Sequence, residues 1–150
     1  MKTMSTLDYE RISPGQALPP LTKHVTVEQI RQYAEASGDR NPIHLDETFA
    51  RSAGLPGVIA HGMLTMAFAN QMVTDWLGDR SVLKHLQGRF AGMVVPGDDV
   101  TCTGTVASKD EATRRIVINL VVTNQRGEKV FNKGVAEAEF APQRSTTNAA

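Results

Sequence analysis

The architecture of this protein is set by its most apolar stretch, GMLTMAFANQMVTDWLG, which runs from Gly62 to Gly78. Its apolar residues go most of the way round a helix wheel instead of forming one stripe, which is typical of a helix buried in a core. The stretch is short for a membrane span, and polar residues such as Thr65 and Asp75 interrupt it. The sequence therefore predicts a central helix over residues 63–77 that other elements cover on several sides.

The chain after this helix is typical of strands joined by tight turns. The candidate strands are residues 83–95, 100–106, 116–123 and 130–140. They are identified by period-two alternation or by runs of β-branched residues, and Gly88 and Gly92 mark expected bulges or points of close approach in the first. A strongly curved antiparallel sheet wrapped around the apolar helix would supply the cover that the helix needs. The predicted fold class is therefore α+β.

The chain before the apolar stretch supplies a second helix. Thr26 followed by Gln29 forms a capping-box pattern that predicts a helix start, and Ser37-Gly38 ends that helix. Residues 9–18 are expected to hold a short strand, which Pro19-Pro20 stop. The two helices thus come early in the chain and the sheet comes late.

Between the two helices lies the stretch GDRNPIH, from Gly38 to His44. Pro42 removes a backbone donor and pushes Asn41 toward extended angles, so we do not expect a regular helix here. The stretch is predicted to be a loop that aims Asp39 and His44 into one small space. A carboxylate beside an imidazole is suited to moving protons at neutral pH. The alternative is that Asp39 caps a turn and His44 packs beneath it.

Gly62 is the first residue of the apolar stretch, and the start of a helix can bind a negatively charged oxygen. The first backbone N–H groups of a helix have no partner inside it, and they carry the positive end of the helix dipole. With a glycine there, a ligand oxygen can approach the backbone closely, which is how an oxyanion site is built. The alternative is an ordinary glycine at the start of a buried helix. Together with the Asp/His loop, Gly62 indicates proton transfer next to a polarised carbonyl.

The bulk composition excludes several classes of function. The chain has 150 residues, of which 41% are hydrophobic, and its sixteen basic and sixteen acidic residues give a formal net charge of zero. No basic patch favours nucleic acid, and no membrane partner is expected. Cys102 is the only cysteine, which excludes an intrachain disulfide and fits a cytoplasmic location. No metal-ligand spacing or phosphate-binding glycine loop is present, so we expect no metal.

The same features resemble the hot-dog fold and, more narrowly, the MaoC-like, type 2 (R-specific) enoyl-CoA hydratases and 3-hydroxyacyl-thioester dehydratases. The resemblance rests on SGDRNPIHLD at residues 37–46, on IAHGM at residues 59–63, and on VPGD at residues 95–98. It spans about residues 9–140, which we expect to form one domain, with a flexible N-terminus (1–8) and a flexible C-terminal tail (141–150).

The resemblance implies roles for individual residues. Asp39 and His44 would be the catalytic pair, with the choice of base and acid left open. The candidates for oxyanion or substrate binding are Gly62, Asn41, His61 and Asn70. In this assignment the Gly62 N–H holds the thioester oxygen, Asn41 orients the pair or the water, and Asn70 is a supporting residue. His61 either touches the substrate or fixes the start of the helix.

The implied activity is (R)-specific hydration of trans-2-enoyl thioesters, or dehydration of (3R)-hydroxyacyl thioesters, in fatty-acid metabolism. The substrate would be carried on CoA or on acyl carrier protein, without a further cofactor. A homodimer is expected and a heterodimer remains open. The rival interpretations are a hot-dog acyl-thioesterase, a subunit of a heterodimeric dehydratase whose partner shapes the acyl tunnel, and an inert acyl-CoA-binding module. Chain length, carrier and physiological direction stay open.

Overall fold

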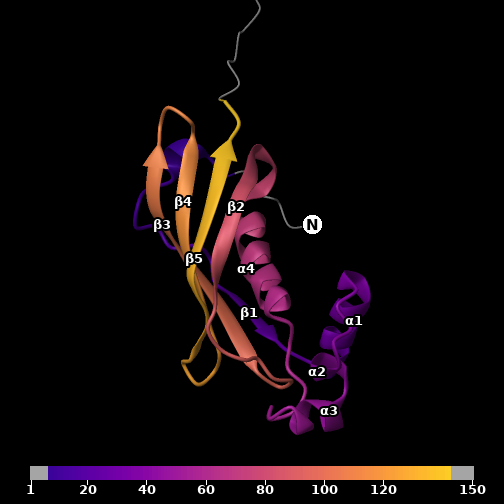
Figure 1. The fold of residues 1–150 in the computed structure, drawn as a ribbon. Helices are drawn as coiled ribbons and strands as arrows, with labels where there is room; N and C mark the ends of the chain where they lie inside the picture. The colour runs from indigo at the N-terminus through magenta and orange to yellow at the C-terminus, as the bar shows by residue number, and fades with distance from the viewer. Residues whose placement is uncertain (1–6, 143–150) are drawn as a thin grey trace, which may run out of the picture.

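The computed structural model of the protein describes residues 7–142 of the 150-residue chain. Most of this part is a five-stranded sheet, a long helix that runs along it, and three shorter helices grouped near one end of the long helix (Figure 1). The expected flexible ends, residues 1–8 and 141–150, fall almost wholly outside the described residues, and their flexibility stays a prediction.

The sheet has the strand order β1-β3-β4-β5-β2, with every neighbouring pair antiparallel. The strands are β1 (Leu21–His24), β2 (Ser81–Phe90), β3 (Asp99–Asp110), β4 (Arg115–Thr123) and β5 (Lys129–Phe140). Buried and exposed residues alternate along most of β3, β4 and β5, so one face of the sheet belongs to the core. In the described part of the chain, β2 forms an edge and pairs only with β5.

Helix α4 (Gly62–Leu77) lies against the inner face of the sheet and contacts all five strands. Its buried core residues are Leu64, Phe68, Ala69, Met72, Val73 and Leu77. A Cβ atom at Gly104 on β3 would lie 3.1 Å from Met72 Cε, so a glycine there lets the helix approach the sheet closely. The predicted central helix is confirmed, and so is the hot-dog α+β fold. Between residues 7 and 142 no helix has the length and apolar character that crossing a bilayer requires.

Helix α1 (Val27–Ser37) begins and ends where the capping residues predict. The Thr26 side chain accepts a hydrogen bond from the Gln29 N–H at 3.1 Å. Gly38 adopts a left-handed conformation with φ of 79°, which a glycine reaches without strain, and its N–H donates to the Ala34 carbonyl. This cap turns the chain directly into the segment that carries Asp39.

The stretch predicted to be a loop contains a short helix, α2 (Pro42–Leu45), which is followed by α3 (Glu47–Ser52). The prediction that Pro42 prevents a helix was wrong because the proline occupies the first helical position. There its missing N–H would have no intrahelical partner in any case. The Asn41 side chain caps the helix by accepting the Ile43 N–H at 3.2 Å.

The N-terminal segment also differs from the prediction. Residues 9–18, expected to be a strand, begin with a 3-10 turn, η1 (Tyr9–Arg11), and meet the sheet through an isolated bridge between Ala17 and Thr105. Strand β1 instead follows Pro19-Pro20 directly. Proline donates no ladder hydrogen bond, so regular pairing with β3 starts only beyond this pair.

Strand β2 was predicted over residues 83–95. It ends earlier than predicted, at Phe90. A register shift beside Gly88 confirms the bulge expected there. Gly92 lies beyond the end of the strand, although the predicted range included it. Its N–H and that of the preceding residue share the carbonyl of Val130, at 3.3 and 2.9 Å, and this bifurcated contact ends the regular ladder.

Candidate active site

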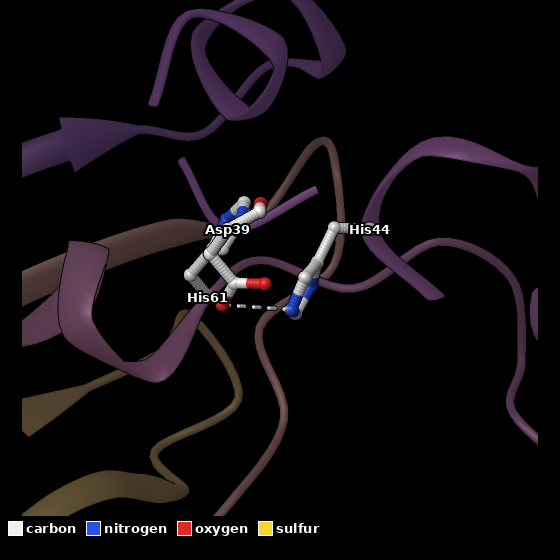
Figure 2. Close-up of side chains that lie close together, drawn as sticks. All are labelled: Asp39, His44 and His61. Atoms are coloured by element: carbon white, nitrogen blue, oxygen red, sulfur yellow. Dashed lines mark hydrogen bonds and ion pairs between the residues drawn. The ribbon is translucent and has the colours of Figure 1, made fainter. Parts of the chain in front are cut away.

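Asp39 is presented by the turn between α1 and α2. It follows the left-handed Gly38, and its Oδ1 accepts the backbone N–H of Asn41 at 3.3 Å. This bond leaves Oδ2 free to face His44 (Figure 2). The Asp39 side chain is 55% exposed. Asn41 thus steadies both candidate groups, since its N–H holds the carboxylate and its side chain caps the helix that carries His44.

His44 lies in α2 and is buried. Its Nδ1 is 2.7 Å from the carbonyl oxygen of Ile59. A carbonyl oxygen only accepts, so Nδ1 carries the hydrogen, and in the neutral ring Nε2 carries the lone pair. This Nε2 is 4.0 Å from Asp39 Oδ2. That distance is too long for a direct hydrogen bond, and a water molecule fits between two such acceptors.

The Ile59 carbonyl, which accepts from the His44 ring, belongs to a segment that backbone hydrogen bonds join to two other parts of the chain. The N–H of Ile59 donates to the carbonyl of Ile43 at 3.1 Å, and the N–H of Ala60 donates to that of Val94 at 2.8 Å. The residue before Ile59 donates its N–H to the Glu47 carboxylate at 3.0 Å, and this hydrogen bond is the main cause of the lowered pKa of Glu47. The direction of the Ile59 carbonyl is therefore well defined, and the ring that it holds is oriented with it.

Gly62 is the first residue of α4, so its N–H has no partner within the helix. The residue is exposed. A Cβ at this position would lie 3.1 Å from two carbons of the Phe90 ring, so the glycine lets the aromatic ring cover the backbone at close range. The helix dipole and an N–H without a partner inside the helix together favour a negatively charged oxygen.

His61 precedes Gly62 and connects the helix start to the pair. Its Nε2 donates to the backbone carbonyl of Asp39 at 2.9 Å, and its ring stacks on that of His44 with 3.8 Å between centroids. The ring of Tyr33 on α1 lies against it at 4.8 Å. Although His61 is the N-cap residue of α4, its side chain makes no capping hydrogen bond. Asp39, His44 and Gly62 are therefore brought together around this one buried ring.

Asn70 is not brought into this group. It lies a little over two turns further along α4, which is about 12 Å from Gly62 at the usual rise per residue. The hydrogen bond described for it joins its backbone carbonyl to the Thr74 hydroxyl at 3.0 Å. The role given to Asn70 by resemblance gains no support from this position.

Asp39, His44 and His61 also form a donor set that sequence spacing did not reveal, with one ligand atom from each within 4.8 Å of the others. A carboxylate and two imidazoles suit zinc, but tetrahedral zinc needs ligand atoms only about 3.4 Å apart for bonds near 2.1 Å. The 4.0 Å between Asp39 Oδ2 and His44 Nε2 is wider than that, and His61 Nε2 is occupied by a carbonyl. The arrangement fits a bridging water better than a metal ion.

The Asp39 side chain at the candidate site is exposed, and so are large apolar side chains on neighbouring segments of the chain. Met63 follows Gly62 and is 54% exposed, and Phe90 over Gly62 is 50% exposed. Met93 is 49% exposed and precedes Val94, whose carbonyl is bonded to Ala60. Apolar residues in this number beside polar groups are typical of a surface that binds an apolar partner or ligand.

Two contacts at the site were not foreseen from the sequence. The Ile59 carbonyl is a backbone group from a segment fifteen positions away from His44, and a backbone contact of this kind leaves no signal in the residue types. The contact between His61 and Asp39 also joins distant positions, and its one visible signal was the adjacency of His61 to Gly62 in the IAHGM motif.

A curved antiparallel sheet around one central helix, with an acid, an imidazole and a glycine-headed helix start at one end, defines a hot-dog protein with an acid/base site. The chain belongs to the MaoC like domain family, which it matches over residues 11–128. The family predicted from the sequence motifs is thereby confirmed.

Solved and curated relatives agree with this membership. The R-hydratase PhaJ1 from Pseudomonas aeruginosa matches with a TM-score of 0.81 and 30% identity, over 90% of this chain and 86% of that one. The peroxisomal enoyl-CoA hydratase 2 of Arabidopsis thaliana is 36% identical over 95 residues, which are 62% of this chain and 26% of that protein. The fatty acid synthase subunit beta of Aspergillus oryzae is 38% identical over 112 residues, 71% of this chain but only 5% of that protein. The chain thus spans a minor part of both curated relatives.

Proposed function

We propose that the protein catalyses the reversible (R)-specific hydration of trans-2-enoyl thioesters, which in reverse is the dehydration of (3R)-hydroxyacyl thioesters. The observation that carries this proposal is the 4.0 Å separation between Asp39 Oδ2 and His44 Nε2, next to the start of α4. Membership of the MaoC like domain family and the likeness to an R-hydratase support it. The acyl group is carried on CoA or acyl carrier protein in fatty-acid metabolism.

In this mechanism one water molecule donates its two hydrogens to Asp39 Oδ2 and His44 Nε2. Both atoms are acceptors, because the carboxylate is ionised and the His44 ring holds its own hydrogen at Nδ1 toward Ile59. The water oxygen then has a lone pair free to attack C3 of the enoyl unit. As the C3–O bond forms, the pair takes one proton from the water. Because the two groups are coupled, they are described as one acid/base unit.

The electrons of the double bond move toward the thioester, whose oxygen gains negative charge as an enolate. The Gly62 N–H at the start of α4 stabilises that oxygen, a contribution of about 10²–10³ in rate. The proton held by the pair is then delivered to C2 on the same face, so that one water is added overall. Because Asp39, in the turn after α1, and His44, in α2, hold the same water, this face is the one from which water also attacks.

The deciding experiment combines crotonyl-CoA with the purified protein. We expect the enoyl absorbance to fall, chiral analysis to give (R)-3-hydroxybutyryl-CoA, and a thiol reagent to detect no free CoA. An S product would contradict the proposed stereochemistry. Release of free thiol at the rate of absorbance loss would replace the hydratase by the thioesterase. Enoyl-CoA substrates of increasing length, and matching acyl-carrier-protein substrates, then define the preferred chain and carrier.

We propose a homodimer as the working assembly, because strand β2 is an edge of the sheet and large apolar side chains near the site are exposed. Mass measurement in solution tests this directly, and a fully active monomer would contradict it. A chain that is inert alone and gains hydratase activity with a second MaoC-like subunit would instead indicate the heterodimer.

A further inference from the structure

His61 occupies an unusual position for the residue at the start of a helix. The side chains of Thr26, Asn41 and Asp46 each accept a backbone N–H of the helix that they begin. The His61 side chain makes no such bond, although it stands at the same position of α4. It is 2% exposed, so its ring is buried without serving the helix start.

The contacts of the ring lead to the candidate catalytic pair. The His61 Nε2 donates to the backbone carbonyl of Asp39 at 2.9 Å, which fixes the peptide from which that carboxylate extends. Its face stacks on the ring of His44 at 3.8 Å with 24° between planes, which opposes tilting of that ring. One side chain thus restrains both members of the pair at once.

The hydrogen-bonding state of the ring follows from its partners. Because a carbonyl oxygen accepts only, the His61 Nε2 carries a hydrogen. Its Nδ1 is buried and has no hydrogen-bond partner among residues 7–142. A buried unpaired polar atom has an energetic cost, so the position would suit an apolar residue better if it served packing alone.

We propose that His61 is a positioning residue, which through its Nε2–H to Asp39 and its stacking on His44 sets the separation that lets the pair share one water. This inference rests on the proposed function, because the water is that of the hydration reaction. His61 does not exchange protons with the substrate. Its effect is on turnover, since geometry in the reacting complex is sensitive to displacements of an ångström or less.

A matched pair of amides tests the proposal. The side-chain nitrogen of His61→Gln reaches about as far as Nε2 and can still donate to the Asp39 carbonyl, whereas that of His61→Asn reaches only about as far as Nδ1. We expect His61→Asn to lower kcat roughly 10-fold or more with KM within about 3-fold, and His61→Gln to recover most of the loss. His24→Asn on strand β1, whose side chain is 62% exposed, is the control for the substitution itself and is expected to match the wild type.

Each other pattern of results overturns the proposal. Equal kcat for His61→Asn and wild type would show that the contact sets nothing. A raised KM at unchanged kcat would indicate that His61 touches the substrate. Equal losses in the two amide variants, both folded by circular dichroism, would indicate a role other than donation to Asp39.

A measurement without substrate keeps the proposal separate from the proposed function. In wild-type protein labelled with ¹⁵N-histidine, nuclear magnetic resonance should find His61 protonated at Nε2 and His44 at Nδ1 in the neutral rings. Hydrogen at His61 Nδ1 alone would overturn the inference, even if His61→Asn fails to fold. An inactive wild type with the expected tautomers would instead count against hydration, and leave the positioning contact in place.

Discussion

Asp39 and Asp98 are two carboxylates in turns of the same chain, and their surroundings differ sharply. The Asp98 side chain is 3% exposed, and its oxygens accept from Val95 N–H (3.1 Å), Gln125 Nε2 (2.9 Å) and Arg126 Nη1 (3.2 Å). The Asp39 side chain is 55% exposed and, among residues 7–142, accepts only the Asn41 N–H, so Oδ2 stays available. Burial raises the pKa of Asp98, but its hydrogen bonds outweigh burial and the pKa is lowered.

The difference shows how one residue type serves two purposes. A carboxylate whose acceptor capacity is filled by its own protein stabilises the fold and has nothing left for a substrate. A carboxylate with a free oxygen, held in direction by one bond, can bind a water and accept its proton. Asp98 fixes the turn next to Val94, whose carbonyl supports the site segment, so the filled carboxylate supports the open one.

The largest expected effect is on turnover at the open carboxylate. Asp39→Asn and His44→Ala should each lower kcat by at least roughly 100-fold, because each removes a member of the acid/base pair. The Asp39 side chain is exposed, so the melting temperature of Asp39→Asn should stay close to that of the wild type. Steady-state kinetics with crotonyl-CoA and a thermal melt measure both quantities. A folded His44→Ala protein with wild-type turnover would remove the pair from the mechanism.

The double variant Asp39→Asn/His44→Ala sharpens the same contrast. If the two groups act on one water as a unit, the second substitution has little left to remove, and the effects are strongly non-additive. We expect kcat of the double variant to lie within about 10-fold of the slower single variant. Multiplication of the two single effects would show that the residues act independently.

Substitution of Asp98, whose acceptor capacity is filled, should change the stability of the fold more than turnover. Asp98→Asn keeps the shape but removes the charge that Arg126, Gln125 and the Val95 N–H address, so we expect a loss of about 1.5–3 kcal/mol in the free energy of unfolding. Turnover per folded molecule should change only a few-fold. Urea unfolding and kinetics on the folded fraction test this, with Asp39→Asn as the opposite case. An unchanged urea midpoint would refute the structural role of Asp98.

The smallest effect is the pH dependence of that loss. Because the folded-state pKa of Asp98 is lowered, its stabilisation is complete above the unfolded-state pKa of about 3.9 and disappears as pH falls through the folded-state value. The difference in unfolding free energy between wild type and Asp98→Asn should therefore be constant from about pH 7 to about pH 5 and shrink toward about pH 2. A difference that grows in acid would contradict the assigned sign.

Much of this architecture could be predicted because its signals are local. The apolar surface of residues 63–77 predicted the central helix, and the Thr26 and Gly38 caps predicted the bounds of α1. The alternation in β3 predicted a half-buried strand. In the site, the spacing of Asp39 and His44 and their placement near Gly62 followed from motifs, although their catalytic roles remain proposals.

The rest depends on information that one segment does not carry. Pro42 excludes a helix interior but permits a helix start, and only the cap by Asn41 shows which applies. The end of β2 at Phe90 is decided by the carbonyl of Val130 on the last strand. Nothing in the VPGD motif at residues 95–98 indicates that the distant side chains of Gln125 and Arg126 meet Asp98. These features depend on contacts between residues that the sequence pattern of a single segment does not show.

The pairing of β2 with β5 has a consequence for synthesis. Helix α4 and strand β2 are complete by Phe90, but β2 finds its only sheet partner in Lys129–Phe140, and α4 is enclosed by strands made after it. During synthesis the apolar helix α4 therefore lacks these strands while some forty further residues are added. The sheet is completed only when its final strand has been made. A chain truncated before Lys129 therefore lacks the strand that pairs with β2, and the apolar surface that it leaves exposed favours aggregation.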